Sequence, residues 1–232
     1  HRMIPFLYSA SVETNAQGLA LIEPMYYQYP DAPESYECRN QYLFGRQLLV
    51  APVTRPGDRE EISEGMARVR VWLPEGRWTD IFTEDEYEGG QLLTMVRWMD
   101  SIPVLAKEGG FLVLDGRSAT NDCGCPERLD VLVFNGNGEY TLYEDGEGGE
   151  DVSKIQFRSQ EEKGVQRLTF RWRGGMSADA PAEREIRLEF RNILTGDVKI
   201  LADGERYPGE TDDNGRLTVE MRGIRPEITY QV

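Results

Sequence analysis

Histidine is nearly absent from this sequence, because the first of its 232 residues, His1, is the only one. A catalytic base must be oriented by packed neighbours, which the first residue lacks. The sequence therefore argues against a self-contained Ser-His-Asp or Cys-His enzyme and against the common His-rich metal sites. It contains neither a P-loop nor a Gly-x-Gly-x-x-Gly turn between a strand and a helix. Any chemistry in this chain would have to use carboxylates.

Cysteine is also scarce, with only Cys38, Cys123 and Cys125. An odd and sparse set does not suit a disulfide framework, and Cys-Gly-Cys without a second pair is a poor zinc signature. We interpret all three as reduced thiols, which favours a reducing compartment such as the cytoplasm. We predict no metal or other cofactor.

Long apolar runs and an excess of basic residues are lacking too. No segment approaches the roughly 18 consecutive apolar residues of a membrane span, and the first residues lack the apolar region and cleavage site of a signal peptide. We therefore expect a soluble protein with no membrane partner. Acidic residues number 41 against 26 basic ones, for a formal net charge of −15. Nucleic acids are held by clustered Lys and Arg, so they are not expected partners either.

Residues 2–17 form the one good helix candidate. Pro5 fits its first turn, and Gly18 fits the left-handed position after its end. Apolar residues from Met3 to Val12 occupy nearly every direction around its first turns, which predicts burial on more than one side. Such a helix at the start of the chain indicates the last piece of a larger domain.

After Gly18 the apolar pattern changes to a period of two, which is typical of strands. Clear alternation is found at 68–73, 129–134, 168–172 and 186–190. Residues 135–138, Asn-Gly-Asn-Gly, predict a hairpin, and further tight turns are expected at 203–204 and 214–215. Many short strands with such turns favour antiparallel sandwiches over a parallel α/β sheet. The polar segment 115–127 predicts a boundary between two β domains.

Acidic residues offer two kinds of candidate site. The stretch Glu144–Asp151 puts five carboxylates on a Gly-rich segment, as a calcium ion would want, but its spacing does not match an EF-hand loop, so we favour a solvated turn. A glycosidase pair would need two acids about 5–10 Å apart. Asp31, Asp80, Asp100 and Asp145 each lie beside a turn or strand end, where an acid is most often a cap or a solvated side chain. We therefore assign no catalytic, substrate-binding or metal-binding residue.

The four tryptophans could stack on sugar rings. Trp72 and Trp172 lie inside strand patterns, where packing in a core explains them equally well, and Trp78 and Trp98 carry no stronger signal. We prefer the core interpretation for any one of them.

Several ordered segments resemble the C-terminal third of glycoside hydrolase family 31, the α-glucosidase and α-xylosidase family. The resemblance is carried by residues 2–8, 24–31, 40–45, 48–53, 71–78, 100–109 and 140–145. Beyond about residue 150 only the general β pattern is similar. The sequence departs from the family at Gly146, where the family has a second Asp after Tyr-Glu-Asp, and in the strand 110–114. Both differences look like loop and packing variation.

The resemblance implies a fold and a division into domains. Family members have an N-terminal β domain, a catalytic (β/α)8 barrel and two C-terminal β-sandwiches. We therefore expect a mainly β chain, with the last barrel helix at 1–18, a proximal antiparallel sandwich at 19–115 and a distal one at 116–232. In the family both catalytic aspartates lie on the barrel, so no catalytic residue is carried over to this chain.

The same resemblance implies a function. The chain would be the non-catalytic part of a retaining enzyme that hydrolyses α-glucosides or α-xylosides, inactive alone and bracing the barrel. Its partners would be the barrel, the N-terminal β domain and, through them, the carbohydrate substrate. Without the barrel, Met3 and Leu7 would be exposed, so self-association through the helix is expected. The alternative is a carbohydrate-binding module that uses aromatic platforms in the distal sandwich.

Overall fold

The structure, a computed structural model, divides the chain into two compact units. It describes residues 1–56, 66–117, 121–146, 152–163, 165–173, 180–191, 201–202, 205–206, 209–211, 216–224 and 230–231. The central unit comprises Ala20–Glu108, and the terminal unit comprises His1–Leu19 with Gly109–Val232. Both are built mainly of antiparallel strands, and the chain begins with the predicted helix, so the mainly β fold class is confirmed. None of the helices in the described ranges is long and apolar enough to cross a membrane.

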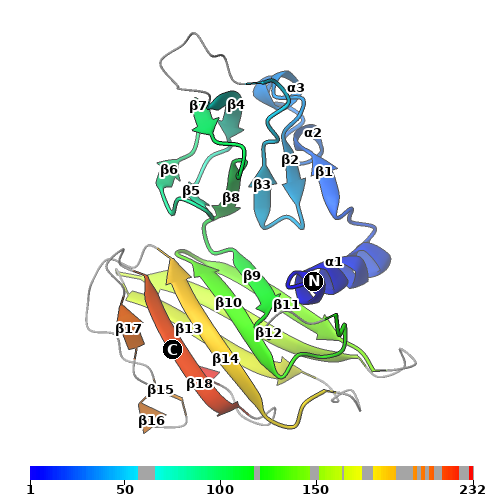
Figure 1. The fold of residues 1–232 in the computed structure, drawn as a ribbon, viewed down its shortest axis with the longest axis vertical. Helices are drawn as coiled ribbons and strands as arrows, with labels where there is room; N and C mark the ends of the chain where they lie inside the picture. Colours follow the sequence, from blue (N-terminus) through cyan, green and yellow to red (C-terminus); the bar gives the residue numbers. More distant parts are fainter. Residues whose placement is uncertain are drawn as a thin grey trace. The chain divides into compact units, whose positions relative to one another are not determined.

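The central unit contains a six-stranded sheet and a separate two-stranded sheet (Figure 1). In order across the larger sheet, the antiparallel strands are β1 (Ile22–Pro24), β2 (Tyr42–Phe44), β3 (Leu48–Val50), β8 (Val104–Lys107), β5 (Arg77–Asp80) and β6 (Glu86–Glu88). The smaller sheet pairs β4 (Ala67–Leu73) with β7 (Gln91–Arg97). Two four-residue helices, α2 (Met25–Gln28) and α3 (Glu34–Glu37), follow β1.

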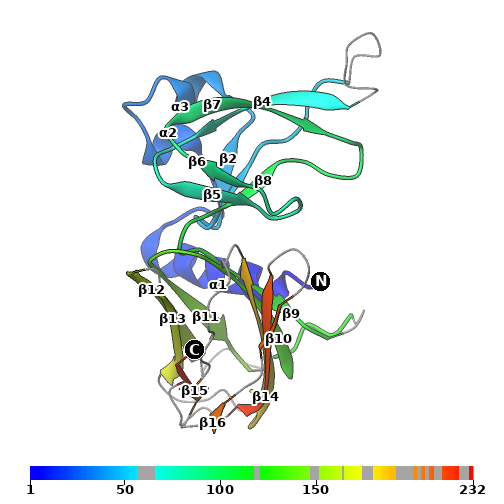
Figure 2. The ribbon, with the colours of Figure 1, turned by 90° about the vertical axis from the view of Figure 1, so that its left-hand side faces the viewer.

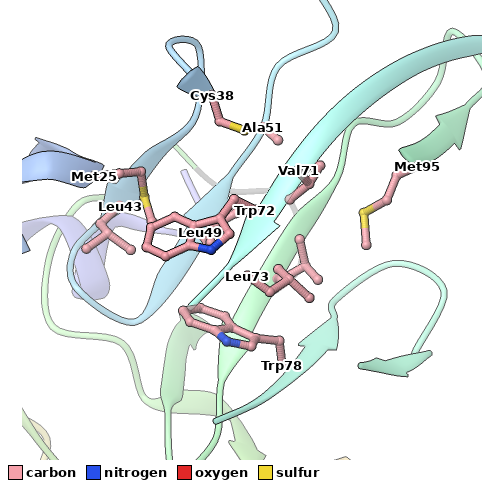
Figure 3. Packing of buried hydrophobic residues seen from close by; sticks show 11 residues of the cluster. Met25, Cys38, Leu43, Leu49, Ala51, Val71, Trp72, Leu73, Trp78 and Met95 are labelled. Atoms are coloured by element: carbon pink, nitrogen blue, oxygen red, sulfur yellow. The ribbon is translucent and has the colours of Figure 1, made fainter. Parts of the chain in front are cut away.

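Aliphatic and aromatic side chains from most of these elements form the core of the central unit (Figure 3). Trp72 and Trp78 belong to it, with 8% and 1% of their surface exposed. The indole Nε1 of Trp78 donates a hydrogen bond to the carbonyl of Pro74 at 2.8 Å, so its one polar atom is satisfied inside the core. Both residues therefore have the core role that was preferred for the tryptophans, which the strand pattern had suggested for Trp72.

The terminal unit is a sandwich of two sheets, shown edge-on in Figure 2. One sheet has the order β17 (Gly209–Thr211), β18 (Leu217–Ile224), β14 (Arg184–Arg191), β10 (Arg128–Phe134) and β9 (Phe111–Asp115). The other has the order β11 (Gly138–Glu144), β12 (Ser153–Glu162), β13 (Val165–Arg173), β19 (Tyr230–Gln231), β15 (Leu201–Ala202) and β16 (Glu205–Arg206).

One strand pair departs from the antiparallel expectation, because β10 and β14 run parallel. Parallel neighbours need a long crossover connection. Here the connection is made by β11, β12 and β13, which cross to the other sheet before the chain returns beside β10.

Helix α1 (Ile4–Gln17) packs on the edge strands β9 and β11 of the two facing sheets (Figure 2). Phe6 is 1% exposed and its ring stacks on Tyr140 with a centroid distance of 6.1 Å. The backbone N–H of Tyr143 donates to Ser9 Oγ at 2.9 Å. The helix therefore closes one edge of the sandwich, and an edge strand that is covered does not offer its open side to other chains.

Helix α1 is less exposed than the sequence analysis expected for a helix without its barrel. Gly18, at φ 70°, ends α1 as predicted. The large apolar side chains of α1, including Leu7, are at least partly buried, because the helix lies against the strands of the terminal unit. Self-association through α1 remains a prediction, as does its origin in a barrel.

The boundary between the two β units lies before the polar segment 115–127. Strand β9 pairs with β10, for example Val113 with Val131, so it belongs to the terminal unit and the polar segment connects two strands of one sheet. The prediction of a proximal domain that extends to residue 115 therefore differs from the division after Glu108. The tight turns predicted at 203–204 and 214–215 lie outside the described residues.

The prediction of a hairpin at 135–138 was wrong, because the two flanking strands, β10 and β11, lie in different sheets. Strand β10 already has β9 and β14 on its two sides, so the turn passes from one layer to the other. The turn is held by Gly109, whose N–H donates to the carbonyls of Phe134 and Asn135 at 3.1 and 2.9 Å. A Cβ on Gly109 would lie 2.1 Å from the carbonyl oxygen of Asn137, and the φ of Gly109 is +69°. Glycine is thus required at this position for both its conformation and its close backbone contact.

Gly109→Ala should lower the free energy of unfolding by about 3 kcal/mol or more, since it combines backbone strain with a steric clash. Gly18→Ala is the matched control, because Gly18 has nearly the same φ of +70° but nothing within 4 Å of an added Cβ. We expect the control to cost only about 1–2 kcal/mol. Chemical denaturation of both variants measures the difference, and equal losses would contradict the role assigned to the close contact.

Candidate docking surface

The four acids considered as a catalytic pair differ in their surroundings. Asp80 is fully buried and pairs with Arg97, and its Oδ1 accepts the backbone N–H groups of Phe82 and Thr83 at 2.9 and 3.2 Å. Asp80 therefore caps a turn, as acids at strand ends often do. Asp31 and Asp100 are both exposed on the central unit.

The acidic stretch that begins at Glu144 starts with a structural ion pair. Both Glu144 oxygens accept hydrogen bonds from Arg184, at 2.7 and 2.8 Å, and these two side chains are 5% and 1% exposed. The pair links β11 of one sheet to β14 of the other. Residues 147–151 lie outside the described residues. Over the described ranges, no three His, Cys, Asp or Glu side chains are grouped so that they could hold a metal ion.

Asp145, the next residue, lies beside Tyr8 of α1 and is partly buried. Burial and the neighbouring Asp145 carboxylate raise the pKa of Tyr8 to about 12. The phenol therefore stays protonated at neutral pH. The thiol of Cys125 donates to the Asp145 carbonyl at 3.5 Å. These contacts tie the end of β11 to the first turns of α1 and to the segment before β10.

Removing Arg184 should strongly destabilise the terminal unit, because it leaves the Glu144 carboxylate buried without its partner. We expect Arg184→Met to cost about 3–5 kcal/mol in chemical denaturation. The control is Arg158→Met, which breaks an ion pair with Glu139 at 3.2 Å between side chains that are 57% and 56% exposed. Its cost should be about 1 kcal/mol or less. A similar cost for both variants would show that the burial of the pair is unimportant.

Two of the four tryptophans lie outside the core of the central unit. Trp98 is 53% exposed and follows β7 beside the fully exposed Met99. Trp172 lies in β13, partly buried, with its ring tilted against Phe170 at a centroid distance of 6.4 Å. Trp172 therefore packs on the interior of the terminal unit, and the carbohydrate-binding alternative remains a prediction.

A group of exposed rings on the central unit was missed by the sequence analysis. This tyrosine cluster consists of Tyr26, Tyr27 and Tyr36, which are 40%, 64% and 51% exposed. The rings of Tyr26 and Tyr36 stack with a centroid distance of 5.4 Å and an interplanar angle of 9°. Tyr27 meets Tyr26 edge to face at 5.2 Å. The cluster is therefore an ordered apolar surface with polar tips.

The two short helices force these rings outward. In α2, Met25 is 1% exposed and fills the core below, so the next two residues face away from it. In α3, Ser35 is 3% exposed and its hydroxyl donates to the carbonyl of Ala32 at 2.7 Å, which leaves Tyr36 on the surface. One signal in the sequence could have revealed that these tyrosines are exposed. Two adjacent tyrosines between Pro24 and Pro30, in a segment too short for a buried helix, cannot both point inward.

An exposed group of large aromatic side chains is typical of a surface that binds a partner. Tyrosine is enriched in protein interfaces because its ring supplies apolar area while its hydroxyl can remain hydrogen-bonded. The hydroxyl of Tyr36 donates to the Pro30 carbonyl at 3.1 Å, so this ring is already oriented before any partner binds. We therefore take the tyrosine cluster as the candidate docking surface.

Comparison with known proteins gives this surface its context. Residues 18–112 match the sequence profile of the glycosyl hydrolase family 31 C-terminal domain. This part of the chain is a family 31 C-terminal domain. The α-xylosidase of Saccharolobus solfataricus is 29% identical over 147 residues, which are 62% of this chain and 19% of that protein. Alpha-glucosidase 2 of Bacillus thermoamyloliquefaciens is 25% identical over 148 residues, 62% of this chain and 18% of that protein.

Solved structures extend the similarity over the whole chain. A dextranase of Flavobacterium johnsoniae superposes on 99% of this chain with a TM-score of 0.81 and 20% identity, and the match covers 31% of that protein. An α-xylosidase of Xanthomonas citri superposes on 100% of it with a TM-score of 0.74 and 25% identity, covering 23% of that protein. The terminal unit therefore shares its fold with these family 31 enzymes. The sequence profile, in contrast, covers residues 18–112, which belong mainly to the central unit.

This chain spans about a fifth of the length of the curated relatives that it matches. The tyrosine cluster lies wholly within the family 31 C-terminal domain.

Proposed function

We propose that this chain is the non-catalytic C-terminal β portion of a family 31 α-glycosidase, in which it braces the catalytic barrel. The match of residues 18–112 to the C-terminal domain supports this function, and so do relatives named as an α-xylosidase and an α-glucosidase. The parent enzyme would hydrolyse α-glucosides or α-xylosides with retention of configuration, through a covalent glycosyl-enzyme intermediate.

The observation that carries the bracing role is the tyrosine cluster. Burying each large apolar side chain contributes roughly 1.5–3 kcal/mol, so three tyrosines could together supply much of the free energy of a contact between domains. We propose that the cluster is the part of the central unit that contacts the remainder of the parent enzyme, which belongs to the same polypeptide.

The division of labour can be tested with two samples, this chain and the complete parent protein, each incubated with aryl α-glucosides and aryl α-xylosides. The complete protein should hydrolyse at least one of the two substrates, and this chain should hydrolyse neither, because its role is structural. Turnover by this chain that survives purification and is lost in Asp145→Asn or Asp100→Asn would overturn the proposal.

The tyrosine cluster can be tested by combining Tyr27→Ser with Tyr36→Ser. In this chain alone the double variant should unfold at nearly the same temperature as the unchanged chain, because both rings are at least half exposed. In the complete protein it should unfold several degrees lower, since the rings would lose a buried contact there. Thermal unfolding of both samples measures the two shifts.

Phe82→Ser supplies the control for this comparison, because Phe82 is 57% exposed in the central unit and is not part of the tyrosine cluster. It should leave the unfolding temperature of the complete protein nearly unchanged. A double tyrosine variant that destabilises both samples equally would mean that the rings stabilise only their own unit, and the docking role would be rejected.

A further inference from the structure

A second surface of the central unit is positively charged, in contrast to the apolar tyrosine cluster. Four arginines, Arg39, Arg55, Arg68 and Arg70, line a cavity of about 320 Å³, which we call the arginine groove. Of the described residues that line it, Glu37 is the one with an acidic side chain. A concentration of positive charge is unexpected in a chain whose formal net charge is −15. It indicates a place that selects negative charge.

Among the residues that the structure describes, carboxylates compensate little of the charge on three of these arginines, Arg39, Arg55 and Arg70. Arg70 Nη2 lies 3.8 Å from Glu37 Oε2. These side chains are 62% and 59% exposed, so the ion pair is weak. Neither Arg39 nor Arg55 forms an ion pair with any residue that the structure describes. Like charges that converge on one cavity repel one another, and a bound anion would relieve that repulsion.

The walls of the groove are fixed by hydrogen bonds between the segments that carry the arginines. The buried Gln41 amide donates to the Trp72 carbonyl at 2.6 Å and accepts the Trp72 N–H at 2.9 Å, which ties the segment after α3 to β4. Asn40 Nδ2 donates to Thr54 Oγ1 at 2.8 Å, which ties the same segment to the chain after β3. The arginines therefore extend from backbone that is already in place, which lowers the entropic cost of binding a ligand.

Arginine suits one class of anion in particular. Its planar guanidinium presents parallel N–H donors that match the oxygens of a phosphate group, and charge-assisted bonds of this kind are the strong ones. A cavity of about 320 Å³ is at the small end of ligand pockets. A polynucleotide would extend well beyond it, over a protein that is negative in total. We propose that the arginine groove binds the phosphate group of a small molecule.

The test titrates this chain with inorganic phosphate and with glucose 6-phosphate in a calorimeter, at an ionic strength held constant with sodium chloride. Saturable binding of both ligands at one site per chain is expected. Arg39→Gln and Arg55→Gln should each weaken binding by about tenfold or more, because each removes a charged donor without breaking an ion pair. The control Arg158→Gln, in the terminal unit, should bind as the unchanged chain does. Thermal unfolding of every variant shows that the fold is retained.

Three results would overturn the proposal. The first is heat that does not saturate or that equals the heat from added chloride, and the second is equal affinity in Arg39→Gln, Arg55→Gln and Arg158→Gln. The third is saturable binding of poly-glutamate without binding of either phosphate compound, which would mean that the groove holds an acidic polypeptide. None of these outcomes depends on the glycosidase activity of the parent enzyme, so the groove and the proposed function are tested separately.

Discussion

The packing of α1 on the edge strands β9 and β11 is the contact on which the terminal unit depends. It joins parts of the chain that are far apart in sequence. Arg2 donates to Asp130 at 2.7 Å across 128 positions, and Asp115 donates its N–H to the Arg2 carbonyl at 2.8 Å. The whole central unit lies between these partners in the sequence. Because the entropy cost of closing a loop rises only with the logarithm of its length, so long an insertion is tolerated once the sandwich edge is covered.

The local features of the fold could be predicted from the sequence, and the partners of each strand could not. Pro5 and Gly18 marked the ends of α1 because their backbone preferences act within one turn. Alternation identified the strands for the same reason. The turn at 135–138 has the composition of a hairpin. Its conformation is set by hydrogen bonds from Gly109, which is distant in the sequence. Which strand lies beside β10 is decided by the whole sandwich, and no local pattern contains that information.

Both surfaces of the central unit escaped prediction for a related reason. The exposure of Tyr26 and Tyr27 is a consequence of Met25 entering the core beneath them, which becomes visible only when the core is assembled. The arginine groove is harder still, since Arg39 and Arg70 are brought together by the contact of Gln41 with Trp72. In contrast, the assignment of no catalytic residue followed both from the position of the acids beside turns and from the resemblance to family 31, and it remains a prediction about the chain.

The two surfaces share α3 but respond to different forces. Tyr36 belongs to the tyrosine cluster, whereas Glu37, the next residue, lines the arginine groove. Contacts between apolar rings depend little on salt, because they are driven by the removal of apolar area from water. Attraction between exposed charges is screened over about 10 Å at an ionic strength of 0.1 M. Under the two proposals, the domain would therefore keep its contact with the rest of the parent enzyme while an anion enters or leaves the groove, since neither process uses the driving force of the other.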